Sequence, residues 1–95
     1  MEGKQKQLYR NRIRQFRMEK GLTQQVLARM MGYQSPSSLS HLERGMKLPS
    51  LITALKLEVA LQRFIGDIFP DLYDEIRDHV GKRRRQLFYP DQDKY

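Results

Sequence analysis

The side chains best suited to chemistry stand together between Gln34 and His41, where the chain reads QSPSSLSH. Four serine hydroxyls and one imidazole can donate and accept hydrogen bonds, and all five side chains are short. The chain shows no nucleophile–base pair and no loop that would cradle phosphates, so we do not expect an enzyme. Small polar side chains on a narrow helix instead fit the major groove of DNA.

Metal and cofactor chemistry has few ligands in this sequence. There is no Cys, and His41 and His79 are the only histidines, so we expect neither a metal site nor a cofactor. A group of carboxylates lacks a matching set of histidines, which favours a solvated acidic helix face over a metal or acid–base site. These carboxylates are Asp71, Asp74, Glu75 and Asp78. No apolar run approaches the roughly 20 residues of a membrane span, so no membrane contact is expected.

The positive charge is confined to one half of the chain. The net charge is +7, and residues 1–49 hold ten Lys and Arg against three Asp and Glu. Residues 50–95 hold eight of each and are neutral overall. The excess therefore coincides with the polar helix, and this favours a polyanion as partner over a surface that is basic only for solubility.

The polar residues lie in the second of two short predicted helices and in the turn between them. Thr23 has the side chain of an N-cap, and Ser35 followed by Pro36 has the signature of a second helix start. Gly32 is expected to turn the chain between the two helices, and Gly45 to end the second one. The inward-facing positions should be Leu27, Ala28, Met31, Leu39 and Leu42.

Such a small pair needs further helices around it, and the apolar spacing predicts four of them. A first helix near residues 6–20 is indicated by Leu8, Tyr9, Ile13 and Phe16, with Gly21 as its end. A helix near residues 51–62 should bury Leu51, Ala54, Leu55 and Leu61. Glu58 falls within that stripe, so we expect it at the edge or beside a basic group.

The last two predicted helices follow at once. Residues 64–69 should form a short one, and Pro70 should open another with Leu72, Ile76 and Val80 on one face. Gly81 is expected to weaken this helix or to end it early. Ile68, Phe69, Leu72 and Ile76 suit either a dimer seam or the core beneath the added helix. The basic run Lys82 to Arg85 suits a solvated helix end, a second DNA anchor or a partner site.

An ordered set of residues resembles the Cro/cI-type (Xre-family) helix-turn-helix domain of bacterial and phage regulators. The resemblance runs from residue 13 to residue 69, through the segments IRQFRMEKGLTQQVLA and LSHLERGMKLPSL. It implies an all-α, five-helix phage-repressor-like domain with an additional C-terminal helix. We therefore expect a DNA-binding domain at residues 1–69, and a helix and tail at residues 70–95 for dimerisation or partner contact.

The resemblance also implies roles for individual residues. Arg17 and Glu43 stand where the family has a structural ion pair. Base edges should be met by Pro36, Ser37, Ser38 and His41. Phosphates should be met by Gln24, Ser35, Arg44 and Lys47.

Two departures from the family pattern concern the helix that would read DNA. The turn from Gly32 to Ser35 is one residue longer than the commonest form, so the entry angle of the helix and the exact role of Gln34 stay open, and Gln34 is counted among the expected DNA-binding residues. The outward positions of this helix are Pro36, Ser37, Ser38, Ser40 and His41. None of them is Arg, Lys, Asn or Gln, so these side chains cannot form the bidentate hydrogen bonds that read guanine or adenine. Sequence choice would then depend on DNA shape, bridging water or Gln34.

The function implied is sequence-specific regulation of transcription in the cytoplasm, at the nucleoid. We expect a repressor that binds double-stranded DNA as a homodimer on a palindromic operator. An alternative is an antitoxin or protein-binding adaptor whose residues 70–95 contact a partner protein. Co-purification of one specific protein would favour the alternative, and tight binding to a short palindrome without it would favour the repressor.

Overall fold

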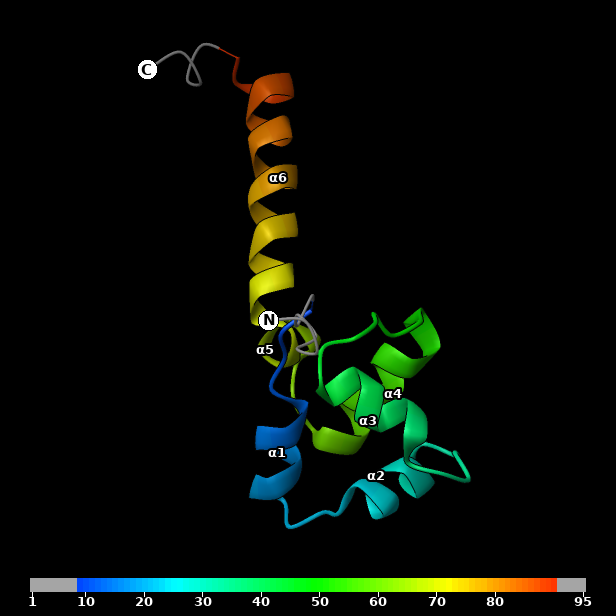
Figure 1. Cartoon of the computed structure of the whole chain (residues 1–95). Helices are drawn as coiled ribbons and strands as arrows, with labels where there is room; N and C mark the ends of the chain where they lie inside the picture. Colours follow the sequence, from blue (N-terminus) through cyan, green and yellow to red (C-terminus); the bar gives the residue numbers. More distant parts are fainter. Residues whose placement is uncertain (1–8, 91–95) are drawn as a thin grey trace, which may run out of the picture.

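The computed structural model describes residues 9–90, and within them the fold is entirely helical, as predicted (Figure 1). Five short helices form a body, and a long sixth helix extends away from it. The helices are α1 (Ile13–Glu19), α2 (Gln24–Met30), α3 (Ser37–Glu43), α4 (Leu51–Leu61), α5 (Ile65–Ile68) and α6 (Pro70–Phe88). No strand occurs in the part of the chain that the structure describes.

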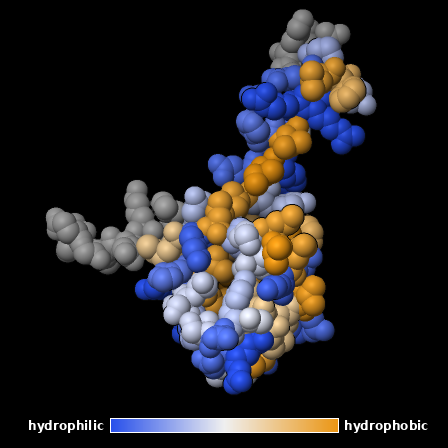
Figure 2. Space-filling model, turned by 90° about the vertical axis from the view of Figure 1, so that its right-hand side faces the viewer, coloured by the Kyte–Doolittle hydropathy of each residue, from blue (hydrophilic) through white to orange (hydrophobic). Residues whose placement is uncertain are grey.

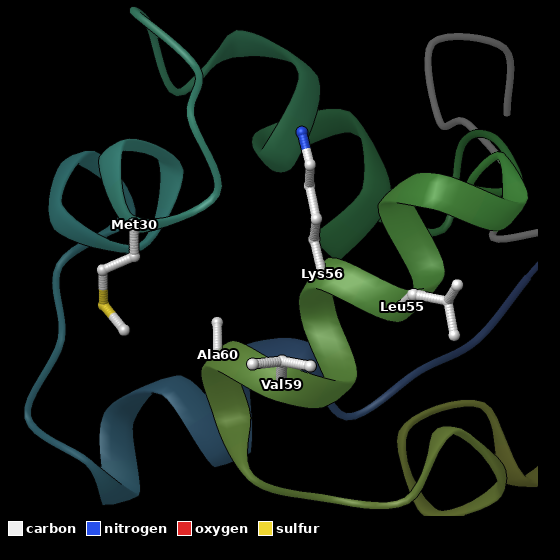
Figure 3. A pocket seen from close by; sticks show the side chains of 5 residues that line it. All are labelled: Met30, Leu55, Lys56, Val59 and Ala60. Atoms are coloured by element: carbon white, nitrogen blue, oxygen red, sulfur yellow. The ribbon is translucent and has the colours of Figure 1, made fainter.

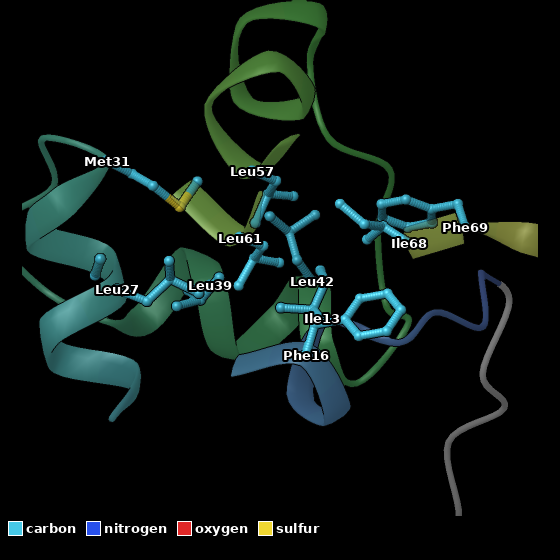
Figure 4. Close-up of a cluster of buried hydrophobic side chains, with 11 residues drawn as sticks. Ile13, Phe16, Leu27, Met31, Leu39, Leu42, Leu57, Leu61, Ile68 and Phe69 are labelled. Carbon is cyan, nitrogen blue, oxygen red and sulfur yellow. The ribbon is translucent and has the colours of Figure 1, made fainter. Parts of the chain in front are cut away.

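A single apolar core joins the five short helices (Figure 4). All five positions predicted to face inward from α2, the turn and α3 are buried within it. The caps that begin and end α2 are also as predicted: Thr23 Oγ1 accepts from the Val26 amide at 3.1 Å, and Gly32 adopts φ +87°. The core consists of Ile13, Phe16, Leu27, Ala28, Met31, Leu39, Leu42, Leu57, Leu61, Ile68 and Phe69.

The first helix begins later than its apolar spacing predicted. It starts at Ile13, and residues 9–12 approach it in a non-helical conformation, while Leu8 lies outside the described residues. Asn11 explains this start, because its Oδ1 accepts from the Ile13 amide at 3.1 Å. Its amide group donates to the carbonyl oxygens of Tyr9 at 3.0 Å and Leu42 at 2.7 Å. The segment is thus fixed by tertiary hydrogen bonds that a helix there would break.

The beginning of α3 is also displaced by one residue. Pro36 is the N-cap and Ser37 the first helical residue, whereas the sequence predicted Ser35 and Pro36 for these places. Ser35 still supplies a hydroxyl to the helix start, since its Oγ accepts from the Ser37 amide at 3.3 Å. Gly45 ends the helix as predicted, with φ +73°.

The predicted buried stripe of α4 was wrong in part. Leu61 is buried, but Leu51 and Leu55 are 75% and 52% exposed, and the buried position is Leu57. The helix carries apolar residues on every side, so its spacing alone could not select the inner face. Glu58 lies at the core edge, where it makes no ion pair with any basic residue between positions 9 and 90, and its Oε2 accepts from the Ile65 amide at 2.9 Å, where α5 begins.

The sixth helix is longer and more exposed than predicted. It begins at Pro70 and continues through Gly81 to Phe88, and none of its residues is buried. The protein is elongated as a result: its radius of gyration is 16.8 Å, whereas a compact chain of this length has about 12 Å. No helix within residues 9–90 has both the length and the apolar composition required to cross a bilayer.

Candidate nucleic-acid interface

Helix α3 divides sharply into a buried and an exposed side. Leu39 and Leu42 are fully packed into the core, at 0% and 1% exposure. Ser37, Ser38 and His41 point away from the core and are exposed. These three residues, called the reading face below, are therefore available to a partner along residues 37–41 of this seven-residue helix. Ser40 lies between the two sides and is half-buried.

The turn before α3 adds more polar groups to the same end of the helix. Gln34 and Ser35 are exposed, and Pro36 is half-buried. Ser35 Oγ lies 3.2 Å from Ser37 Oγ and donates to it, so these two hydroxyls already form a hydrogen bond in the free protein. A phosphate or base acceptor would have to replace that weak, exposed bond, which costs little because water can satisfy both hydroxyls.

A buried polar network holds α3 against α1 and α2. The guanidinium of Arg17 contacts Glu43 through two bonds, Nε to Oε2 at 2.6 Å and Nη2 to Oε1 at 3.2 Å. The two side chains are only 11% and 4% exposed. Arg17 Nη1 also donates to the Leu22 carbonyl at 2.8 Å. The ion pair expected between Arg17 and Glu43 is thus present, and it fixes the orientation of the helix that carries the reading face.

Gln24 is the third member of this network. Its amide nitrogen donates to Glu43 Oε1 at 3.0 Å, and the residue is half-buried. A carboxylate only accepts hydrogen bonds, so the nitrogen end of the amide must face Glu43. One amide hydrogen is used in this bond, and the second remains for a contact at the start of α2. The sequence predicted a phosphate contact for Gln24 but missed its part in holding α3.

Asn11 is a second positioning residue that the sequence analysis missed. Through Leu42 it holds the last turn of α3, and beside it the Tyr9 amide donates to the Gly45 carbonyl at 3.1 Å. The signal was available, because Asn just before an apolar helical pattern is a common start residue. It was obscured by the apolar spacing of Leu8 and Tyr9, which extended the predicted helix across it.

Basic side chains flank the C-terminal end of α3. Arg44 is exposed and bends back over the helix, where its Nε donates to the Ser40 carbonyl at 3.4 Å. Lys47 is exposed in the loop between α3 and α4. The interface therefore has neutral hydroxyls in its middle and positive charge at one edge, which is an arrangement suited to a surface edged by phosphates.

An apolar hollow near the helix pair has a different character. It has a volume of about 410 Å³ between α2 and α4 and is lined by Met30, Leu55, Lys56, Val59 and Ala60 (Figure 3). None of the predicted DNA-binding residues lines it. Within residues 9–90, no three His, Asp or Glu side chains converge as metal ligands would. The candidate interface on and beside α3 is therefore separate from this hollow.

The segment that carries the candidate interface matches a known protein family. Residues 13–63 match a family model described as helix-turn-helix, HTH_3. The restriction-modification controller protein C.AhdI from Aeromonas hydrophila is 38% identical, with a TM-score of 0.55 over 61% of this chain and 86% of that one. The clp gene regulator ClgR from Corynebacterium glutamicum is 28% identical, with a TM-score of 0.55 over 82% of this chain and 86% of its own. A search of curated proteins found no match.

Proposed function

The chain belongs to the helix-turn-helix family HTH_3, and from this premise we propose that it regulates transcription by binding a palindromic operator as a homodimer. Its similarity to two gene-regulatory proteins supports DNA binding and regulation, and gives no support to an enzyme. Such a protein acts where the DNA lies, at the nucleoid in the cytoplasm. Occupancy of the operator would repress the adjacent gene.

The observation that carries the proposal is the exposed reading face on a rigidly held helix. Ser37, Ser38 and His41 would meet base edges in the major groove, with Pro36 against a thymine methyl or a sugar. Gln34, which is exposed in the preceding turn, would add a side-chain amide to this face. Two such helices in a dimer would lie about 34 Å apart, one turn of the duplex.

Phosphate contacts would set the position of the protein on the duplex. The donors proposed for this are Gln24, Ser35, Arg44 and Lys47. Together with the +7 charge of residues 1–49, they make affinity depend on displaced counterions. Six phosphate contacts would weaken binding by roughly 10³-fold between 50 and 200 mM salt. An affinity that stays constant over this range would contradict the proposal.

The roles within the interface are tested by selecting bound fragments from genomic DNA with purified variants. Ser38→Ala and His41→Ala should change the selected sequence, because they alter groups at base edges. Lys47→Ala should weaken all sites alike and reduce the salt dependence by about one counterion. Lys20→Ala is the matched control, since this exposed lysine donates to Gln62 at 2.8 Å and lies off α3. Equal, uniform losses from Ser38→Ala, His41→Ala and Lys47→Ala would show that the reading face is elsewhere.

A second candidate function concerns the C-terminal segment. We propose that residues 1–69 form the DNA-binding domain and that residues 70–95 serve dimerisation or partner contact. The matched family region ends at residue 63, and α6 exposes apolar side chains beyond it. An antitoxin or adaptor would use that segment to bind a different protein. Co-purification of one stoichiometric partner would favour this candidate over the homodimeric repressor.

A further inference from the structure

Helix α6 exposes a row of apolar side chains along one side, interrupted near its end by Arg83. Tyr73, Ile76, Val80 and Leu87 share one side, spaced three, four and seven residues apart. Ile76 is 54% exposed, Val80 57% and Leu87 77%. Figure 2 shows this row leading from the projecting helix down onto the body. Four large apolar residues in one row on a helix without any buried residue indicate a surface that is covered by something else.

The row leads into a groove at the root of the helix. The groove has a volume of about 250 Å³, and its walls come from the α3–α4 loop, α4, α5 and the first turns of α6. Tyr73 and Ile76 belong to both the row and the groove, so the two surfaces are continuous. The remaining lining residues are Leu48, Pro49, Ala54, Ile65, Phe69 and Leu72.

The charges of α6 are separated along its axis. Residues 70–81 contain four carboxylates and one arginine, a net charge of −3. Residues 82–85 are Lys-Arg-Arg-Arg, a net charge of +4. Two such helices side by side repel when parallel, because acidic lies on acidic and basic on basic. When antiparallel, each acidic half lies beside a basic half.

We propose that a second copy of this chain covers the row, with the two α6 helices antiparallel and the tip of each in the groove of the other. The inference rests on the homodimer of the proposed function and names its surface. The seam spacing of the row and its continuity with the groove support this occupant. The separation of charge along the helix axis favours the antiparallel over the parallel orientation, and the four carboxylates themselves lie away from the seam. The groove of the partner subunit would then cover the apolar tip formed by Leu87, Phe88 and Tyr89. All three residues are exposed in the monomer.

The spacing of the row supports the same register. Positions 69, 73, 76, 80, 83 and 87 advance by alternating steps of four and three, the pattern of a two-helix seam. In this register Asp78 lies level with its own copy in the second chain. Ile76 then lies opposite Val80 of the partner subunit. The register also sets Tyr73 against Arg83 of the partner subunit, which suits a cation–π contact. Phe69 in the groove then meets Leu87 of the partner subunit.

The first test is the association state of the full chain by sedimentation equilibrium. The wild type should dimerise, and Val80→Asp should raise its dissociation constant about 100-fold, because it places two carboxylates in the central layer. Val59→Asp is the matched control: Val59 is 76% exposed on α4 and should leave the dimer intact. A monomeric wild type, a Val80→Asp dimer of normal strength, or equal losses in both variants would overturn the proposal.

The second test determines the direction of the pair by disulfide formation. The chain contains no Cys, so introduced thiols have no competitors. A Tyr73→Cys, Arg83→Cys double variant should form a covalent dimer, since the two positions are about 15 Å apart within one helix and cannot close on themselves. Leu87→Cys alone should remain uncrosslinked. The reverse result, with crosslinking only through residue 87, would indicate a parallel pair and would overturn the proposal.

The experiments distinguish a failure of the proposed dimer surface from a failure of the proposed DNA binding. If the dimer surface is wrong but DNA binding is right, Val80→Asp keeps wild-type association and wild-type operator affinity. If DNA binding is wrong, the wild type is a dimer sensitive to Val80→Asp that binds no selected DNA fragment. A stoichiometric foreign protein that binds the row in place of a second copy would overturn the inference and leave DNA binding unaffected.

Discussion

The body formed by α1–α5 and the projecting helix α6 are stabilised in opposite ways. In the body, eleven apolar residues pack together, and the Arg17–Glu43 pair is buried among them. In α6 no residue is buried, and its ion pairs, such as Arg77 with Asp74 at 3.3 Å, lie at the surface. The difference shows that the geometry of the reading face is determined within one chain, whereas the surroundings of α6 depend on what it binds.

This contrast has a direct thermodynamic meaning. Substitutions in the body should change the free energy of unfolding at any protein concentration. Substitutions of the exposed apolar side chains of α6 should change it chiefly where a second molecule is bound, because association stabilises the folded state by mass action. Measurements on dilute, monomeric protein therefore separate the two regions.

The largest effect is expected from truncation in the core. Leu57→Ala removes a side chain with 0% exposure and should lower the free energy of unfolding by about 2–5 kcal/mol. Leu87→Ala in α6 should change it by less than about 0.5 kcal/mol in dilute protein. Urea unfolding followed by circular dichroism measures both. A similar loss for the two variants would mean that α6 is packed as firmly as the body.

A somewhat smaller effect is expected from the ion pairs. Glu43→Gln leaves the buried guanidinium of Arg17 without its counter-charge and should destabilise the fold by about 3 kcal/mol. Asp74→Asn removes a pair whose side chains are 60% and 56% exposed, and it should cost no more than about 0.5 kcal/mol. The comparison is made by thermal unfolding at two salt concentrations. It would fail if Glu43→Gln were as mild as Asp74→Asn.

The smallest effect is expected from two glycines, and it should differ in sign. A Cβ at Gly66 would meet the ring of Phe64, which stacks edge-on with Tyr73 at 5.4 Å, so Gly66→Ala should cost about 1 kcal/mol. A Cβ at Gly81 meets only the flexible end of Arg85 at 3.6 Å, so Gly81→Ala should stabilise α6 by about 0.5–1 kcal/mol. Calorimetry and helicity by circular dichroism measure the two changes. A stabilising Gly66→Ala would show that the root of α6 is loosely held.

The fold was predictable from the sequence wherever local chemistry determines it. Thr23 begins α2 and Gly32 follows its end. Both ends could be predicted because a hydroxyl cap and a positive φ depend on only a few neighbouring residues. Two features could not be predicted in this way. The inner face of α4 depends on which neighbours reach it, and Gly81 interrupts nothing because helix propensity is a weak preference.

The candidate site was predictable to a similar extent. The burial of Leu39 and Leu42 follows from spacing, and it leaves the hydroxyls and His41 outside. The role of Gln24 could not be predicted, because its bond to Glu43 joins residues 19 positions apart. Asn11 likewise acts over 31 positions on Leu42. Short-range chemistry identifies which groups face outward, and long-range hydrogen bonds determine how firmly they are held.

The attachment of Glu43 to both neighbouring helices also determines which molecule must adapt on binding. Rolling or tilting α3 would stretch three short bonds to one carboxylate, so the protein presents a fixed template. The duplex is then the more compliant of the two, and sequences that bend or narrow readily would be preferred even at base pairs that no side chain touches.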